Sequence, residues 1–400
     1  MTLTSIELFT GAGGLALGVH QAGFRHLAVA EYDRHAVETL RLNRAIAGLD
    51  DVEIERTNVA DVDWSPFAGR VDLLAGGVPC QPFSLGGRHR GHEDARNLFP
   101  EMLRAVRDIA PAAVLVENVK GLLRSSFAPY FAHVLRQLQM PELSARAGEL
   151  WHEHDARLIR ESEAYRRRGD LLYTTRHQLI QAADYGVPQL RERVFIVAYR
   201  ADIGRTWRPP DPTHSESRLV HEMYGTREYW DEHGVPRRRP PRDLPAQIEL
   251  GSELRWRTVR DALSGLPEPM RHRVPNHGAG HREVCHWANP GARPYHGHEG
   301  SDRDWPAKTL KAGVHGVPGG ENMLRNSNGS VRYFSVREAA RIQTFPDDYH
   351  FSGTWGEAFR QIGNAVPVLL ASVVARQVAA TLHSAAREAH AEQRSLVASG

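Results

Sequence analysis

The chain has 400 residues, of which 41% are hydrophobic and 24% charged, and its net charge is +2 at pH 7. That length predicts two domains, the near-neutral balance excludes a uniformly basic nucleic-acid binder, and the only two cysteines, Cys80 and Cys285, exclude a disulfide framework. No apolar run approaches the length of a membrane span and no basic leader precedes the first strand, so we expect a cytoplasmic protein without a membrane partner.

Short apolar runs alternate with helical patterns in the first half of the chain. Strands are predicted at 5–9, 26–31, 71–77, 112–118, 173–181 and 193–199, and helices at 15–22, 34–46, 98–109 and 128–140. Buried strands separated by helices are typical of parallel βαβ units, so we expect an α/β, doubly wound, Rossmann-like sheet. The segment from about 140 to 168 is densely charged and helical, which indicates a solvated face.

The texture of the chain changes at about residue 201. Segments such as RPPDPTH and GVPRRRPPRDLP are rich in Pro, Gly, Arg and His, and they predict a second, smaller and irregular domain over 201–330. Helical patterns return over 331–385, and residues 386–400 resemble a flexible tail.

The segment ELFTGAGGLALG predicts a strand, a glycine loop and a helix. Gly11, Gly13 and Ala16 fit the relaxed dinucleotide pattern G-x-G-x-x-G/A, and Glu31 ends the second strand where it could accept both hydroxyls of a ribose. The pattern indicates an adenosine-like cofactor, but a nicotinamide-dependent oxidoreductase or a generic strand–helix turn would also explain it.

Cys80 lies where the third predicted strand ends, in the segment GGVPCQPFSLGG. The glycines and cations that follow it would stabilise a thiolate, which is the nucleophilic form, although an inert loop thiol is the alternative. Glu117 ends the next strand at the same sheet edge and could hydrogen-bond a ring nitrogen, unless it is only a capping or salt-bridged carboxylate.

The glycine loop, PCQPFS, ENV, QLRER and GNAVP, in this order, resemble the motifs of the C5-cytosine DNA methyltransferase family. The resemblance covers most of the chain and implies a methyltransferase domain over 1–200, completed by about 331–385, with a target recognition domain over 201–330. It also implies a bacterial restriction–modification enzyme that flips a cytosine out of duplex DNA, converts it to 5-methylcytosine, and protects host DNA from a separately acting restriction endonuclease. We expect a monomer.

The same resemblance assigns catalytic roles. Cys80 would add to C6 of the target cytosine, Glu117 would bind N3 and the exocyclic amine, and Arg193, with Arg191 as a second candidate, would hold the flipped base.

For the cofactor, the resemblance implies S-adenosyl-L-methionine and no metal. Residues implied around its methionine, ribose and adenine are Phe9, Gly11, Ala12, Gly13, Gly14, Glu31, Tyr32, Asn58, Val59, Leu98, Asn364 and Val366. One departure concerns Asn58, because the family usually carries an aspartate there and Asp61 lies nearby in the sequence.

The expected DNA contacts come from three segments. A Thr-Leu element resembling the one that family members place against DNA is flanked by two of the three lysines, which we expect to touch phosphates unless they are only surface lysines. The predicted contacts are Gln81, Ser84, Arg88, Gln189, Lys308, Thr309, Leu310 and Lys311.

Other interpretations stay open. An RNA cytosine-5 methyltransferase would use the same catalytic domain, and a catalytically dead DNA-binding regulator would not need its thiol. The basic run at 236–242 could be a phosphate-binding arm or a solvated linker. A zinc site is disfavoured because the histidines and the one cysteine around 272–298 lack paired C-x-x-C spacing.

Overall fold

The computed structural model describes residues 2–79, 98–241, 249–270, 285–296, 298–312, 320–326 and 328–399. By internal packing the chain divides into two compact units. Unit 1 comprises Met1–Ile180, Glu192–Pro210 and Ala371–Gly400, and unit 2 comprises Gln181–Arg191 and Asp211–Leu370. Unit 2 therefore contains both the irregular segment and much of 331–385, and the functional division expected from the sequence stays a prediction.

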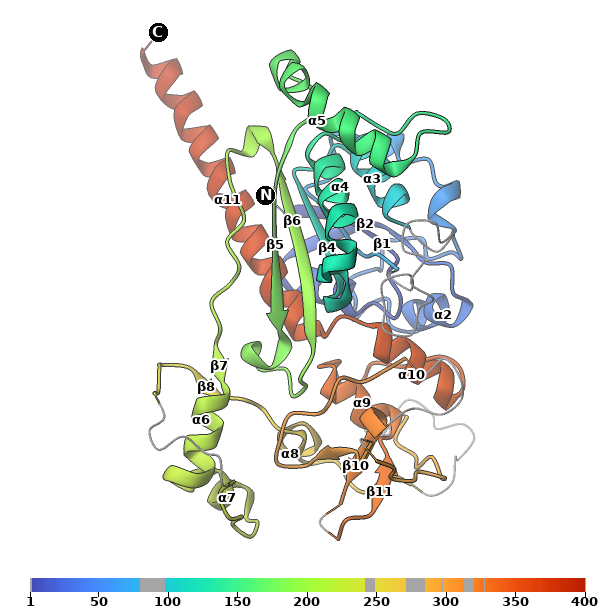
Figure 1. Ribbon diagram of the computed structural model, residues 1–400, viewed down its shortest axis with the longest axis vertical. Helices are drawn as coiled ribbons and strands as arrows, with labels where there is room; N and C mark the ends of the chain where they lie inside the picture. Colours follow the sequence, from blue (N-terminus) through green and yellow to red (C-terminus); the bar gives the residue numbers. More distant parts are fainter. Residues whose placement is uncertain are drawn as a thin grey trace. The chain divides into compact units, whose positions relative to one another are not determined.

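Unit 1 is built on a six-stranded sheet in the order β2-β1-β3-β4-β6-β5 (Figure 1). Its strands are β1 (Leu3–Leu8), β2 (Phe24–Ala30), β3 (Leu73–Gly77), β4 (Ala113–Val119), β5 (Tyr173–Gln181) and β6 (Glu192–Arg200). The first four strands pair in parallel, which confirms the α/β fold class, whereas β6 pairs antiparallel with β4. Only residues 182–191 join β5 to β6, a connection too short for the crossover that parallel neighbours need.

The helices of unit 1 begin and end close to the predicted positions. They are α1 (Gly14–Gln21), α2 (Arg34–Leu42), α3 (Phe99–Ile109), α4 (Ala128–Gln139), α5 (Trp151–Arg168) and α11 (Val368–Ser399). The predicted helix 34–46 stops at Leu42. The tail expected at 386–400 is instead helical through Ser399, because its Ala-rich sequence has strong helix propensity and no proline.

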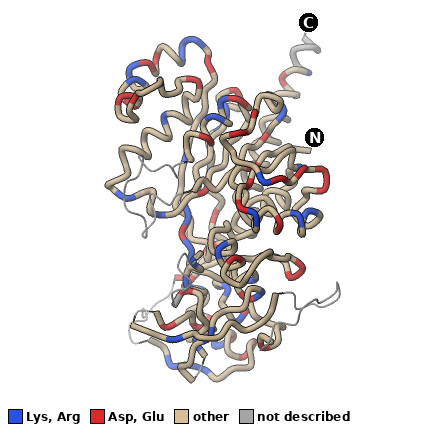
Figure 2. The backbone as a smooth tube through the Cα atoms, turned by 90° about the vertical axis from the view of Figure 1, so that its right-hand side faces the viewer, with Lys and Arg blue, Asp and Glu red and all other residues tan. Residues whose placement is uncertain are grey.

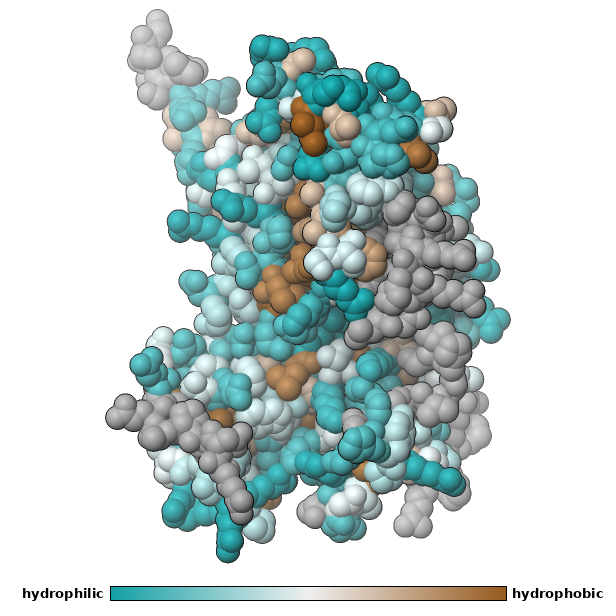
Figure 3. All heavy atoms as spheres, viewed as in Figure 1, coloured by the Kyte–Doolittle hydropathy of each residue, from teal (hydrophilic) through white to brown (hydrophobic). Residues whose placement is uncertain are grey.

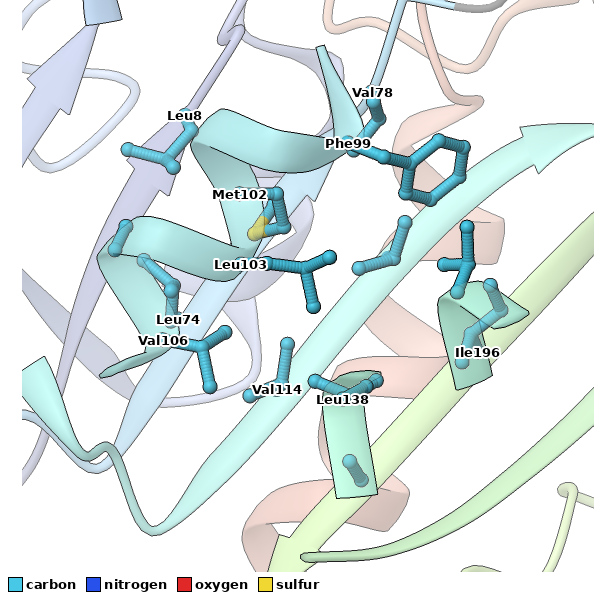
Figure 4. Close-up of a cluster of buried hydrophobic side chains, with 14 of the residues drawn as sticks. Leu8, Leu74, Val78, Phe99, Met102, Leu103, Val106, Val114, Leu138 and Ile196 are labelled. Atoms are coloured by element: carbon cyan, nitrogen blue, oxygen red, sulfur yellow. The ribbon is translucent and has the colours of Figure 1, made fainter. Parts of the chain in front are cut away.

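The core of unit 1 packs α3 and α4 against the sheet, as Figure 4 shows for Leu74, Met102 and Val114. Buried residues of α3 recur three and four positions apart, so one face of the helix covers the sheet. Gly76 makes this close packing possible, because a Cβ there would lie 2.6 Å from Cε of Met102 and 2.8 Å from the Leu8 carbonyl oxygen.

Unit 2 is formed of short elements, as the sequence predicts. Its helices are α6 (Glu216–Val220), α7 (Glu228–His233), α8 (Val259–Leu263), α9 (Val336–Ile342) and α10 (Trp355–Asn364). A three-stranded sheet contains β9 (Ser301–Asp302), β10 (Met323–Arg325) and β11 (Val331–Tyr333), and a two-stranded sheet contains β7 (His214–Ser215) and β8 (Leu254–Arg255).

Single helical turns complete the described chain. The 3₁₀ turns are η1 (Val59–Asp61), η2 (Ser65–Phe67), η5 (Lys120–Leu123), η6 (Ser125–Phe127), η7 (Ala182–Tyr185), η8 (Ala201–Ile203) and η10 (Gly320–Asn322), and η9 (His221–Gly225) is a π turn.

One helical stretch bears on the sequence expectation about membrane spans. The helical stretch Trp355–Arg394 contains an 18-residue window with a mean hydropathy of 1.7, long and apolar enough to meet the composition of a membrane span. However, 67% of that window is buried inside the protein, which is also the pattern of a core helix in a globular domain.

The surface is of mixed character. Figure 2 shows Lys and Arg interspersed with Asp and Glu along both units, in keeping with the net charge of +2. The face in Figure 3 is mostly hydrophilic, with small, separate hydrophobic groups.

Candidate active site

The glycine loop after β1 has the conformation that its glycines permit. Gly11 and Gly13 have φ angles of 57° and 82°, in the left-handed region, and Gly13 occupies the N-cap of α1. Phe9 also has a φ of 57°, an uncommon conformation for a side chain of this size. A Cβ built on Gly11 would meet no heavy atom within 4 Å, so the loop borders open space among the described residues.

Glu31 follows β2 and binds the glycine loop directly. Its carboxylate accepts hydrogen bonds from the backbone N–H groups of Gly11 (2.6 Å), Tyr32 (2.9 Å) and Asp33 (2.7 Å). Burial raises the pKa of Glu31, and the three backbone donors oppose that rise. Each carboxylate oxygen can accept more than one hydrogen bond, so the group retains capacity for a ribose hydroxyl.

The remaining predicted adenine contacts divide between the units. The Tyr32 side chain is 62% exposed, and Asn58 is exposed while its Oδ1 accepts from the Ala60 N–H at 3.2 Å to cap η1. Val59 is buried beside that cap. Leu98 occupies the N-cap of α3, whereas Asn364 and Val366 belong to unit 2.

Two buried side chains that we did not predict contact the elements that flank the glycine loop. His26 contacts the Ser5 hydroxyl through Nδ1 (3.0 Å) and the Ala16 carbonyl oxygen through Nε2 (3.0 Å). Burial lowers the pKa of His26 to about 4, so the neutral ring donates from Nε2 and accepts at Nδ1. Burial also holds the pKa of Glu7 well above its usual range, and its Oε2 has no hydrogen-bond partner in the described part of the chain.

These residues fit an adenosine-containing cofactor. The donor set combines an open glycine loop, a carboxylate aligned on that loop, an exposed aromatic ring and an orphaned buried carboxyl oxygen. Side chains alternate between the two faces of β2, and this alternation places His26 on the buried face. The same alternation in the sequence was the signal that could have predicted it.

The second part of the site lies where β4 and β6 pair. Nε of Arg193 lies 2.9 Å from Oε1 of Glu117, and the exposed fractions of the two side chains are 12% and 9%. Arg193 pairs with Val119 and Phe195 pairs with Glu117, so Glu117 and Arg193 occupy the same face of the sheet. The antiparallel direction of β6 therefore brings a guanidinium to the predicted carboxylate.

The end of β3 lies beside this pair. Gly77 is the register partner of Glu117, and a Cβ on Gly77 would lie 3.4 Å from the other oxygen, Oε2. Asn118 donates from Nδ2 to the Val78 carbonyl oxygen at 3.3 Å. This bond holds the chain just after β3, which ends at Gly77, three residues before Cys80 in the sequence.

Residues 80–97 lie outside the described part of the chain. The predicted roles of Cys80, Gln81, Ser84 and Arg88 fall on this segment and stay predictions.

Arg191 has different surroundings from Arg193. It is 1% exposed, and its guanidinium donates to the carbonyl oxygens of Leu310 (3.1 Å), Gly363 (2.8 Å) and Ala365 (2.9 Å), all within unit 2. A guanidinium used in this way joins distant backbone segments. These contacts give Arg191 structural partners within unit 2, and its role as the second catalytic candidate stays a prediction.

The Thr-Leu element is held by the segment just before Arg191. Gln189, which is fully buried, accepts from the Leu310 N–H at 2.9 Å and donates to Oε1 of Gln343 at 3.0 Å. The Thr309 hydroxyl donates to the Leu190 carbonyl oxygen at 2.6 Å. Gln189 and Leu310 are both buried, so these bonds show how the Thr-Leu element is held, and the DNA contacts expected of the two side chains stay predictions.

The three lysines differ in their partners. Lys308 is exposed, and its ammonium forms no ion pair with a described residue. Lys311 pairs with Oε1 of Glu321 at 2.8 Å, and Lys120 pairs with Glu192 at 2.7 Å. Among the described residues, Lys308 is therefore the lysine without an ionic partner, and its contact with a phosphate stays a prediction.

The first arginines of the basic run at 236–242 form ion pairs with residues of unit 2. Arg237 pairs with Asp231 at 3.0 Å, and Arg238 pairs with Asp302 at 2.8 Å. These contacts within unit 2 favour a structural role for the first part of the run.

Two clusters contain side chains of the types that bind cations. His272, His277 and His281 lie outside the described residues, and buried His286 contacts the Ser335 hydroxyl and the Pro267 carbonyl oxygen. Glu232, His233 and Asp261 come within 4.8 Å of one another. Arg255 already neutralises both of these acids, at 3.1 Å and 2.7 Å.

The comparisons with known proteins agree on one family. The model of the family described as C-5 cytosine-specific DNA methylase matches residues 3–141 and 163–380. Type II methyltransferase M.NgoMIV of Neisseria gonorrhoeae is 32% identical over 382 residues, covering 94% of this chain and 97% of that protein. Type II methyltransferase M.PspPI of a Psychrobacter species is 32% identical over 403 positions, covering 96% and 80%. The Dnmt2 methyltransferase of S. pombe shares the fold, with a TM-score of 0.54 at 17% identity over 96% of this chain and 99% of that one.

Proposed function

Because the chain belongs to the C-5 cytosine-specific DNA methylase family and is a DNA cytosine-5 methyltransferase, we propose that it methylates cytosine in a specific duplex sequence through a covalent Cys80 adduct. The observation that carries the proposal is the Glu117–Arg193 pair beside the end of the strand that leads to Cys80. An acid and a cation held side by side would serve a cytosine ring, which needs both.

S-adenosyl-L-methionine supplies the electrophilic methyl group in this proposal. The glycine loop would approach its methionine part, Glu31 its ribose and Tyr32 its adenine, with Asn58 and Val59 at the adenine edge. The capping bond of Asn58 leaves its amide nitrogen available there, and so we assign the adenine edge to Asn58 rather than to Asp61.

The chemistry begins at the thiolate of Cys80, which forms a bond to C6 of the cytosine. Addition breaks the C5–C6 double bond and places electron density on C5, N3 and the ring carbonyl. C5 then accepts the methyl group as the methyl–sulfur bond of the donor breaks and S-adenosyl-L-homocysteine leaves. A base removes the proton from C5, and the returning electron pair expels the thiolate from C6. The thiol is regenerated, and the product is 5-methylcytosine.

Glu117 and Arg193 would stabilise the charge that develops during addition. A protonated Glu117 would donate to N3 and accept from the exocyclic amine, and Arg193 would turn to the ring carbonyl oxygen. The sheet holds both groups before the base arrives, which lowers the reorganisation needed at the moment of reaction.

The DNA must present the target base outside the helix, because stacking shields C5 and C6. Residues 201–330 would recognise the sequence, with Lys308 on a phosphate and Thr309 near the DNA. We place the enzyme in the bacterial cytoplasm as a monomer, in a restriction–modification system with a separate endonuclease.

The proposal is tested by expression in cells that lack cytosine methylation, followed by bisulfite sequencing of their DNA. We expect 5-methylcytosine within one short recognition sequence, and none with Cys80→Ala. Methylation that is absent with the native protein, or that persists with Cys80→Ala, would overturn the proposal.

A second measurement tests the adduct itself. DNA that contains 5-fluorocytosine cannot lose a proton from C5, so the reaction should stop at the Cys80–C6 bond. A complex that survives denaturing electrophoresis is expected with the native protein and not with Cys80→Ser.

A further inference from the structure

The exposed ring of Tyr32 is covered on one side by Arg56. The guanidinium carbon of Arg56 lies 4.3 Å from the ring centroid, within the range of a cation–π contact. Because Tyr32 is nevertheless 62% exposed, most of its remaining surface is open to a ligand.

Two hydrogen bonds to backbone carbonyl oxygens also hold the segment around Arg56. Its Nε donates to the Tyr32 carbonyl oxygen at 2.7 Å, and the N–H of the next residue, Thr57, donates to the Glu31 carbonyl oxygen at 2.8 Å. Glu31 and Arg56 thereby form a parallel bridge outside the main sheet.

This bridge links the two segments that the proposed function assigns to adenine. Tyr32 lies on one segment, and Asn58 follows Arg56 by two residues on the other. A further hydrogen bond holds the turn after Asn58, because Nη2 of Arg104 donates to the Val59 carbonyl oxygen at 2.7 Å.

We propose that Arg56 is a positioning residue for the adenine of the methyl donor: it stacks on one face of Tyr32, fixes the ring and leaves the other face for the base. The inference rests on the proposed function, because it takes the cofactor to be an adenosine derivative. It adds a residue that touches Tyr32 and need not touch the ligand.

The test is a double-mutant cycle in ligand affinity, measured by titration calorimetry with S-adenosylhomocysteine and separately with adenosine. Arg56→Met keeps a stem of similar length and removes the cation and the donor, and Tyr32→Ala removes the ring. We expect Arg56→Met to weaken binding about three- to five-fold for both ligands, as an exposed cation–π contact would. In the Tyr32→Ala background the same change should have almost no effect.

A matched control is available in the same unit. Arg168 covers the Tyr165 ring at 5.4 Å, and Arg168→Met should leave the affinity unchanged. Thermal unfolding of each variant checks that the exposed substitutions leave the fold intact.

The outcomes separate the two proposals. Unchanged affinity in Arg56→Met, or an equal loss with and without Tyr32, would overturn the positioning role while the cofactor assignment stands. A native protein that binds neither ligand would overturn the cofactor assignment and this inference with it.

Discussion

Arg193 and Glu117 form a nearly buried ion pair between antiparallel neighbours, with Nε and Oε1 2.9 Å apart. A carboxylate in such a position is oriented by its partner, and the partner is in turn kept from solvent. Removing either member leaves an unpaired charge with little access to water, so the pair has consequences for both folding and chemistry.

Glu117→Gln should lower the rate of methyl transfer at least about a hundred-fold, because the amide cannot donate a proton to N3 in the way a carboxylic acid can. Single-turnover transfer of a labelled methyl group measures the effect. Glu192→Gln is the matched control, since it breaks the exposed pair between Glu192 at the start of β6 and Lys120 in η5, and it should leave the rate near that of the native enzyme. Equal losses in both variants would contradict the assignment.

Arg191→Ala and Arg193→Ala should fail in different ways. Loss of Arg191 leaves three carbonyl oxygens without their buried donor, and we expect the free energy of unfolding to fall by about 3 kcal/mol. Arg193→Ala should also lower the stability, because it removes the guanidinium that pairs with the Glu117 charge, and it should in addition abolish the methyl transfer. Denaturant unfolding together with the transfer assay distinguishes them, and an unaltered stability in Arg191→Ala would refute the structural role.

His26 predicts a pH dependence of stability. Its pKa is about 4 in the folded protein and about 6.5 when unfolded, so protonation favours the unfolded chain. The stability linked to His26 is complete above pH 6.5 and is lost as the pH falls from there towards 4, by about 3 kcal/mol in total. Urea unfolding of the native protein and of His26→Gln at several pH values should show their difference shrinking or reversing with acid. A difference that is constant from pH 7.5 to 4.5 would show that His26 does not titrate in this way.

Lys308 and Lys311 should contribute unequally to DNA binding. Lys308→Gln is expected to reduce the slope of log K against log salt by about one, whereas Lys311→Gln should reduce it less, because Glu321 already balances that charge. Fluorescence anisotropy with a duplex at several salt concentrations measures both slopes. Neither change should alter the preferred sequence, since phosphate contacts carry no base information.

Much of unit 1 could be predicted from the sequence because hydrophobic period and turn residues are local signals. The glycine loop, Glu31 and Glu117 all lie at the strand ends where the pattern places them. The reversed direction of β6 could not be predicted in this way, because pairing direction depends on how short the connection from β5 is and not on the apolar pattern of either strand.

Arg191 and Arg193 show where motif reasoning stops. They lie two residues apart in QLRER, and the sequence gives both the same chemistry. Their surroundings differ because the carbonyl oxygens that engage Arg191 belong to residues 310, 363 and 365, more than a hundred positions later. The sequence motifs likewise predict DNA contact for Gln189 and Leu310, and only tertiary packing reveals that both side chains are buried.

The last helix, α11, belongs to unit 1 from Ala371 onwards, and Glu388 in that helix pairs with Arg205. Buried Val374 and Val378 join the same helix to the unit that contains the glycine loop. The residues of α11 must therefore be synthesised before this unit can close. A chain truncated before Ala371 lacks buried Val374 and Val378, and it should yield an incomplete domain rather than a partly active enzyme.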